Sequence, residues 1–220
     1  MKSTFYRFKI SEVIKTYKQK IRDEILKNEE EIDTTDKALY ESLLLEMTTK
    51  DKYKSETGVE YNKEIYINLN PLISDLIAEQ KIENGFVICT SDHTTASVFI
   101  SHFEKENITY LSKALKKDYP YAPKTYKHNI WDHKYKNANG HLKSVFTGNG
   151  NVAACTAPLD VISAAKSASL TKSCITPISH GMLLLNPYDD IINAEFDYRP
   201  DKTFTIALFS DEPAQGKTTK

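Results

Sequence analysis

The strand-like segments of this chain follow one another without a regular alternation with helices, and this order restricts the fold more than any other feature. Residues 63–69 alternate between apolar and polar side chains, which is the period-two pattern of a half-buried strand. Helices are predicted after it, at 70–84, and at about 108–119. Further strands are predicted at 86–90, 96–100, 181–185, 191–196 and 203–208, the last two joined by a hairpin turn at 197–201. Neighbouring strands of this kind favour an α+β fold over a parallel α/β fold.

The first fifty residues have a different, helical pattern. Residues 4–10 could form a short strand, and 11–49 are rich in Lys, Glu and Leu, with apolar side chains at helical spacing over 13–26. Residues 31–36 interrupt this spacing with side chains that can cap a second helix, which would carry Leu39, Leu43, Leu44 and Met47. The sequence therefore predicts a helical hairpin within residues 1–56, with a role in packing or assembly.

The size and composition of the chain suit one buried core. Its 220 residues are 40% hydrophobic and 27% charged, as in ordinary globular domains. The formal net charge of -1 gives no field that would attract nucleic acid or an anionic membrane. No segment approaches the roughly 18 consecutive apolar residues of a membrane span, and the N-terminus has no secretory apolar run. We expect a cytoplasmic protein without nucleic-acid or membrane partners.

Three cysteines, Cys89, Cys155 and Cys174, are an odd number at spacings that match neither a CxxC zinc site nor a small disulfide framework. We expect them to be buried free thiols.

The histidines favour a functional site, because most of the six flank predicted strands instead of lying in helices. Imidazole can bind a metal or transfer protons near neutral pH, so several histidines at strand ends could converge on one pocket. The segment 137–144 adds an amide, an imidazole, an ammonium and a hydroxyl, a set suited to holding a phosphate or polarising a carbonyl. The alternative for this segment is an Asn-Gly turn followed by a strand.

Several common enzyme signatures are missing from the sequence. Gly148-Asn149-Gly150 lacks the spacing of a phosphate-binding glycine loop and is better explained as a turn. No GxSxG elbow, HExxH helix or kinase-like motif set is present. The sequence thus excludes the most frequent hydrolase, zincin and phosphotransferase patterns.

Four sequence blocks in a fixed order resemble the YjbQ-like family, often labelled secondary thiamine-phosphate synthase. The family signature runs HTTA, then Asn-Ala-x-x-His-x-Lys-Ser, then a strand that ends in Glu-Phe-Asp. The matching blocks here are His93-Thr94-Thr95-Ala96, Tyr126-Lys127-His128-Asn129, Asn137 through Ser144, and Glu195-Phe196-Asp197. Four blocks in the right order are more specific than any one alone.

The resemblance implies a compact α+β fold with a mainly antiparallel sheet, usually assembled as a trimer. It also implies a pocket that is lined by the histidine motifs and can hold a divalent metal, zinc or magnesium. The match to the family motifs implies catalytic roles for His93, His141 and Glu195. The same motifs imply substrate contacts at Thr94, Thr95, Asn137, Lys143 and Ser144, and metal ligation by His93, His128 and His141.

Three departures from the family pattern concern the predicted pocket. His102 stands where the family has the glutamate of an Ile-Asn-Glu segment, and Asn139 stands where it often has a histidine. Tyr188 and Asp189 close a segment that reads Gly-Thr-Trp-Gln in the family. These changes leave the choice of substrate open.

The resemblance also divides the chain. Residues 57–212 match the family domain, which leaves 1–56 as a helical extension and 213–220 as a flexible tail. The alanine-rich segment 153–170 is predicted to be a helical insertion, either a surface helix or a cover for the pocket.

The sequence leaves three hypotheses about the function of the chain. The first is a small-molecule enzyme, a thiamine-phosphate synthase-like transferase acting on a phosphorylated substrate at the histidine-rich site. The second is a non-catalytic module that binds a ligand or metal, with the helical extension contacting a protein partner. In the third, the domain is structural and the helices carry the function.

Overall fold

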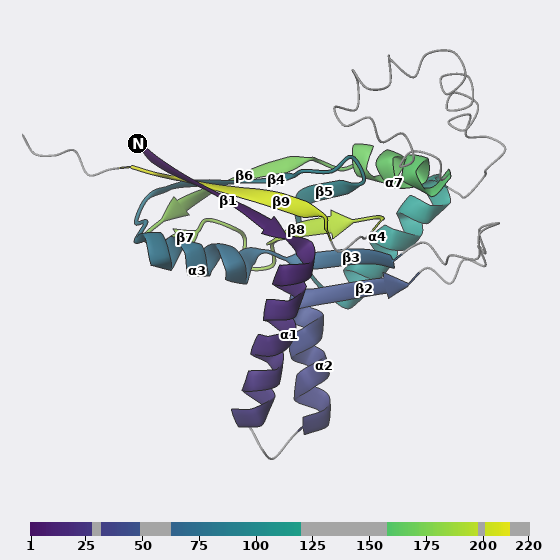
Figure 1. Ribbon diagram of the computed structural model, residues 1–220, viewed down its shortest axis with the longest axis horizontal. Coiled ribbons are helices and arrows are strands. Elements are labelled where there is room, and N and C mark those ends of the chain that lie inside the picture. The colour runs from purple at the N-terminus through teal and green to yellow at the C-terminus, as the bar shows by residue number, and fades with distance from the viewer. Residues whose placement is uncertain (28–31, 49–62, 120–157, 198–200, 212–220) are drawn as a thin grey trace, which may run out of the picture.

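Two antiparallel sheets pack face to face in the computed structural model, which describes residues 1–27, 32–48, 63–119, 158–197 and 201–211 (Figure 1). The five-stranded sheet has the order β1 (Lys2–Lys9), β9 (Thr203–Ser210), β4 (Gly85–Ser91), β6 (Ser173–Ser179), β7 (Met182–Leu183). The four-stranded sheet has the order β2 (Leu44–Thr48), β3 (Lys63–Asn68), β8 (Asp190–Glu195), β5 (Ala96–Ser101). The predicted α+β fold with mainly antiparallel strands is confirmed.

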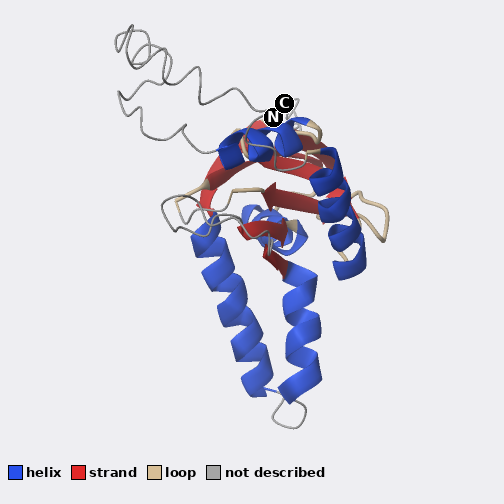
Figure 2. Ribbon diagram, turned by 90° about the vertical axis from the view of Figure 1, so that its right-hand side faces the viewer, coloured by secondary structure: helices blue, strands red, loops and turns tan. Residues whose placement is uncertain are grey.

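Five described helices accompany the sheets: α1 (Ile10–Lys27), α2 (Ile32–Leu43), α3 (Asn70–Gln80), α4 (Lys105–Asp118) and α7 (Pro158–Ala168). The predicted helical hairpin is confirmed, because α1 and α2 run side by side and project from the sheets (Figures 1 and 2). Among the described residues, no helix combines the length and apolar character that a membrane span requires.

The main core lies between the sheets and includes the first part of α1. Inward side chains of both sheets meet there, with Ile65 and Ile191 from one and Val87 and Ile206 from the other. Tyr17 of α1 is 2% exposed. Its hydroxyl donates to the Asn68 carbonyl at 2.9 Å. A second cluster lies on the other face of the four-stranded sheet, under α4. The first 48 residues thus supply a strand to each sheet and a helix to the shared core.

Two sequence-based expectations about local structure were wrong. Residues 44–48 form β2 instead of continuing the second helix, because pairing with β3 buries Leu44 and Leu45. Such tertiary pairing outweighs helix propensity. β8 and β9 are not paired as a hairpin, since β8 pairs with β3 and β5 whereas β9 pairs with β1 and β4. The chain crosses from one sheet to the other there.

Gly85 begins β4 at a place where no side chain fits. A Cβ atom at this residue would lie 1.9 Å from the carbonyl oxygen of Phe209. Only glycine allows β4 and β9 to approach this closely.

Candidate functional site

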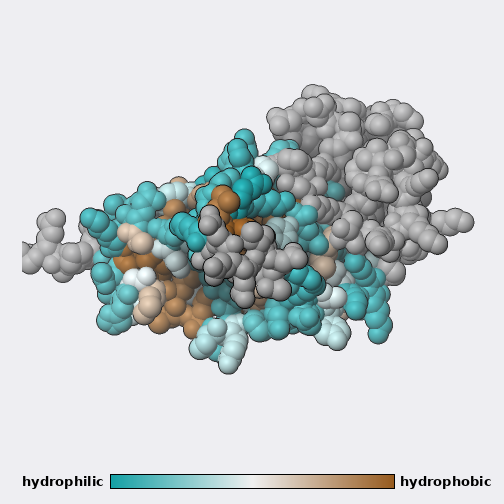
Figure 3. Space-filling view, turned by 90° about the horizontal axis from the view of Figure 1, so that it is seen from below, coloured by the Kyte–Doolittle hydropathy of each residue, from teal (hydrophilic) through white to brown (hydrophobic). Residues whose placement is uncertain are grey.

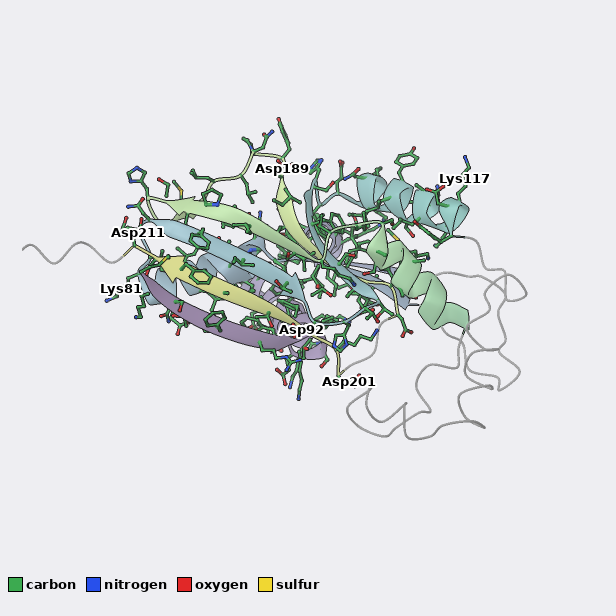
Figure 4. The ribbon with its side chains drawn as sticks, turned by 90° about the horizontal axis from the view of Figure 1, so that it is seen from above. Lys81, Asp92, Lys117, Asp189, Asp201 and Asp211 are labelled. Carbon is green, nitrogen blue, oxygen red and sulfur yellow. The ribbon has the colours of Figure 1, made fainter. Side chains whose placement is uncertain are left out.

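The candidate site lies at the corner where the chain passes between the sheets twice. β4 ends at Ser91 and β5 begins at Ala96, so the HTTA turn spans the two sheets. β8 ends at Glu195 and β9 begins at Thr203 beside it. Asp92 and Asp201 accordingly lie near each other at one end of β9 (Figure 4). Segments a hundred residues apart in the sequence therefore meet at this corner.

Glu195 is the centre of the corner. Its side chain is completely buried, and its Oε1 atom accepts a hydrogen bond from the Thr95 hydroxyl at 2.7 Å. The same oxygen accepts from Lys202 Nζ at 2.9 Å and from the Asp197 amide at 3.0 Å. The other oxygen, Oε2, is buried and has no hydrogen-bond partner among the described residues. A buried carboxylate oxygen of this kind is an acceptor held ready for another group.

Lys202 neutralises this buried carboxylate. Its ammonium, with a side chain 7% exposed, also donates to Thr95 Oγ1 at 2.5 Å and lies 3.5 Å from Asp197 Oδ2. Removing either partner of such a buried ion pair would leave an uncompensated charge. The hydrogen bonds of Glu195 and Lys202 to Thr95 hold this end of the turn against β8.

A second lysine holds the backbone of the turn. Lys172 Nζ donates to the carbonyl oxygens of His93 at 3.0 Å, Thr94 at 2.9 Å and Ala96 at 2.7 Å. It also bonds the hydroxyl of Ser167 on α7. Burial lowers the pKa of Lys172, and the nearby Glu195 carboxylate opposes this. Lys172 therefore gathers three carbonyl groups around one cation and fixes the shape of the turn.

His93 is held by a backbone hydrogen bond. Its Nε2 atom accepts from the Thr203 amide at 3.0 Å, so we assign the ring proton of the neutral form to Nδ1. Burial lowers the pKa of His93 below its ordinary value, partly offset by the charge of Glu195. At neutral pH the residue is thus a neutral imidazole that offers an Nδ1–H donor.

Asp92 joins the turn to the start of β9. It accepts from the hydroxyls of Thr203 at 2.7 Å and Thr205 at 3.0 Å, and from Arg7 at 2.9 Å. Burial raises the pKa of Asp92, but these donors outweigh it and lower the pKa below its ordinary value. The carboxylate thereby ties β1, β4 and β9 together beside His93.

The structure brings three of the predicted site residues together, namely His93, Thr95 and Glu195. Thr94 is adjacent, with its side chain on an exposed residue. The remaining predicted residues lie outside the described part of the chain: His128, Asn137, His141, Lys143 and Ser144. So does Asn139, one of the departures from the family pattern.

Two other departures lie away from this corner. The rings of His102 and Tyr188 pack edge to face with centroids 5.9 Å apart. His102 follows the last residue of β5, whereas the HTTA turn precedes the first. These changes therefore do not alter the contacts of His93, Thr95 or Glu195.

In this geometry His93 does not serve as one of the predicted metal ligands. A neutral imidazole has one proton, so while Nε2 accepts from Thr203 the Nδ1 atom is protonated and cannot ligate a metal. No group of three potential metal ligands occurs within the described ranges. The described residues do not form a metal site by themselves, and we assign no chemical step to a metal.

Sequence reasoning missed Lys172, Lys202 and Asp197. Asp197 was predicted only as the end of the last family block and the start of a turn at 197–201, and neither Lys202 nor Lys172 was singled out. Their only local signal is a charged residue beside a strand end, which is common on protein surfaces. Their burial results from contacts between distant segments.

A shallow hollow of about 480 Å³ lies elsewhere, on the α4 side of β5. Its lining is mostly apolar and includes Phe99, Leu111 and Leu170. None of the predicted site residues lines it, so chemistry points to the corner and not to this hollow.

Comparison with known proteins finds one family and two similar folds. The family model described as UPF0047 protein YjbQ-like matches residues 56–159. A YbjQ-like protein of unknown function from Sulfolobus solfataricus has a similar structure, with a TM-score of 0.51 and 11% identity over 96% of this chain and 100% of that one. A hypothetical protein from Aeropyrum pernix gives a TM-score of 0.50 and 13% identity over 76% and 97% of the two chains. No curated protein matched the chain.

The family match includes the HTTA turn and the segment 137–144, and the structural similarity extends over both sheets. The chain is thus similar to the YjbQ-like family, UPF0047, over residues 56–159, and its fold is similar to that of a YbjQ-like protein.

Proposed function

We propose that the chain is an enzyme that acts on a small phosphorylated molecule at the corner between its sheets. The observation that carries the proposal is the buried Glu195 Oε2, which has no partner among the described residues and lies beside a neutral His93. A buried carboxylate oxygen without a partner lowers the stability of the fold, and such groups occur where a ligand is bound or a proton is transferred. A site used only for packing would have no need of one.

In this proposal the described residues bind and orient the substrate. His93 Nδ1–H and the Thr94 hydroxyl donate to phosphate oxygens, and Glu195 Oε2 accepts from a hydroxyl or amino group of the substrate. Asn137, His141, Lys143 and Ser144 would complete the site and add positive charge. Lys172 and Lys202 hold the turn and the carboxylate in place.

The reaction that we propose is a transfer of the thiamine-phosphate synthase type. The C–O bond between a pyrimidine-methyl group and its diphosphate breaks, and a C–N bond to the nitrogen of a thiazole phosphate forms. Pyrophosphate leaves with the electron pair of the broken bond, and thiamine phosphate is the product. Donors at the departing diphosphate stabilise the charge that develops there.

The test is an assay of thiamine phosphate formation from these two substrates, with wild type, Glu195→Gln and His93→Gln. The proposal expects activity in wild type and a loss of about a hundredfold or more in both variants, as for a lost transition-state contact. His102→Gln is the matched control, because that histidine lies at the far end of β5, and it should keep full activity. Equal activity in all four proteins would refute the assigned site.

A second candidate, a non-catalytic binding module, is favoured by the projecting arm of α1 and α2. The arm stands clear of the sheets (Figure 2), and Leu26 near its tip is 68% exposed. On the face that carries the arm, hydrophobic residues gather to the left, where Figure 1 places α3 and β7 (Figure 3). Stoichiometric binding of the thiazole phosphate without turnover would favour this module over the enzyme.

Self-association is also proposed, as a cytoplasmic homotrimer. The outer face of the five-stranded sheet exposes Phe5, Ile175 and Met182, at 66%, 64% and 65%. Phe86 and Phe209 stack on this sheet with centroids 4.6 Å apart. Exposed apolar surface of this kind marks interaction sites. Ile175→Lys should shift the protein towards monomer in sedimentation velocity, whereas an unchanged trimer would place the interface elsewhere.

A further inference from the structure

Two cysteines face each other across neighbouring strands of the five-stranded sheet. Cys89 on β4 and Cys174 on β6 are direct partners in the antiparallel register. Opposite residues in such a ladder have Cα atoms about 4.5 to 5.5 Å apart. A disulfide joins Cα atoms that are about 4.4 to 6.8 Å apart. The backbone therefore already holds the pair at a separation that a covalent bond between the sulfur atoms permits.

The two thiols interact and differ in accessibility. Both are free; Cys89 is buried, whereas Cys174 is only partly so. The Cys89 side chain hydrogen-bonds to Cys174, which raises the pKa of Cys89, as burial also does. The same hydrogen bond lowers the pKa of Cys174 and outweighs the effect of its burial. Cys174 is thus the better nucleophile and the more accessible thiol, and Cys89 is placed behind it as the resolving thiol.

We propose that Cys89 and Cys174 form a reversible thiol–disulfide site whose co-reactant is a low-molecular-weight disulfide. The Cys174 thiolate attacks one sulfur atom of the small disulfide, forming a mixed disulfide and releasing one small thiolate. Cys89 then attacks Sγ of Cys174, closes the cross-strand disulfide and releases the second thiolate. The thiolates take up the protons that the cysteines lose. The protein loses two electrons and the small disulfide gains them.

The position of the pair connects it to the corner between the sheets. Cys174 follows Lys172 by two residues, and Cys89 precedes His93 by four. Lys172 holds the carbonyl groups of the HTTA turn. A disulfide would lock β4 to β6 next to these contacts and so fix their spacing. The proposal does not depend on the enzymatic function, because the thiols react whether or not a substrate is turned over.

The experiment uses the full chain equilibrated with reduced and oxidised glutathione at a series of ratios. After acid quenching and alkylation of remaining thiols, peptide mass spectrometry should identify a Cys89–Cys174 linkage that increases with the oxidised fraction. The linkage should disappear on addition of dithiothreitol. Cys155→Ser, which leaves the pair unchanged, should give the same titration as wild type.

A second measurement detects the neighbouring thiols in native protein, in which Cys89 and Cys174 are both present. Phenylarsine oxide binds two neighbouring thiols together, so native wild-type protein and Cys155→Ser should each bind one equivalent. Cys174→Ser should bind none and should accumulate no intramolecular disulfide. The proposal is overturned if glutathione labels only Cys155, if the linkage joins Cys155 to another cysteine, or if the arsenical fails to bind native Cys155→Ser.

Discussion

Two buried carboxylates, Glu64 and Glu195, each pair with a lysine, but they use their oxygen atoms differently. Glu64 Oε1 accepts from Lys166 at 2.7 Å, and its Oε2 accepts from Tyr66 and Ser112 at 3.1 and 2.8 Å. Glu195 concentrates its donors on Oε1 and leaves Oε2 without a partner among the described residues. Each carboxylate has three donors, one of them a lysine, and both side chains are almost completely buried.

The difference separates a structural pair from the pair that we propose to bind substrate. Glu64 joins β3 to α4 and α7 and has a donor on each of its oxygen atoms. Glu195 joins β8, β9 and the HTTA turn through one oxygen, and its other oxygen has no partner among the described residues. A buried ion pair alone therefore indicates little about function, and the distribution of donors over the two oxygen atoms indicates more.

The largest effect should come from breaking the structural pair. Lys166→Met leaves Glu64 buried without its cation, so the free energy of unfolding should fall by about 3 to 5 kcal/mol. Urea unfolding followed by circular dichroism measures it. Lys105→Met is the control, because Lys105 pairs with Glu41 on the surface, and should leave the midpoint unchanged. A loss as small as that of the control would contradict the comparison.

The comparison is sharpened by replacing each carboxylate with an amide. In Glu64→Gln the new NH₂ group must face one of the donors, whereas in Glu195→Gln it can occupy the Oε2 position and keep the other contacts. We expect a loss of about 3 to 5 kcal/mol for Glu64→Gln and about 1 to 3 kcal/mol for Glu195→Gln. Substrate turnover should show the reverse order in properly folded protein. Equal losses of stability would mean that Oε2 of Glu195 is satisfied as well.

A smaller effect is expected from the cation that holds the HTTA turn. Lys172→Met removes the donor of three carbonyl groups, and because the side chain is partly exposed, water can replace it in part. Stability should decrease by about 1 kcal/mol. Hydrogen exchange should become faster in the turn 92–96 and remain unchanged in α4. Unchanged exchange in the turn would show that Lys172 does not hold it.

The smallest effect concerns pH. Because burial lowers the pKa of His93 from 6.5, the unfolded chain takes up a proton before the folded one does. This residue therefore contributes stability above pH 6.5, and the contribution is lost as the pH falls through the folded pKa. His93→Gln should flatten the decrease of stability below pH 6.5. His102→Gln serves as the comparison, and an equal flattening in both variants would disprove the assignment.

Much of the fold could be predicted from local patterns, but the sheet order could not. The strands β3, β4 and β5 and the helical hairpin follow from apolar spacing. The pairing of β1 with β9 joins Lys2 to Ser210, and no local signal encodes a contact over such a distance. The error at 44–48 has the same origin, since a helix-forming segment became a strand only through its neighbour β3.

For the site, the family motifs identified His93, Thr95 and Glu195, which do meet. The lysines that hold them were not predicted, because a lysine beside a strand end is ordinarily solvated. Only the crossing of the chain from β8 to β9 takes Lys202 out of water. His128, His141 and Lys143 lie outside the described residues, so their roles stay predictions.

The central place of β9 sets the order in which this protein can be completed during synthesis. β9 lies between β1 and β4, so β1 has no neighbour among the described strands until residues 203–210 have been added. Glu195 is likewise made before Lys202, its cation. On the ribosome, β1 stays an unpaired strand until β9, the last described strand, has been made, so contacts of high sequence separation are formed late. The corner that we propose to bind substrate is therefore also the last part of the fold to close.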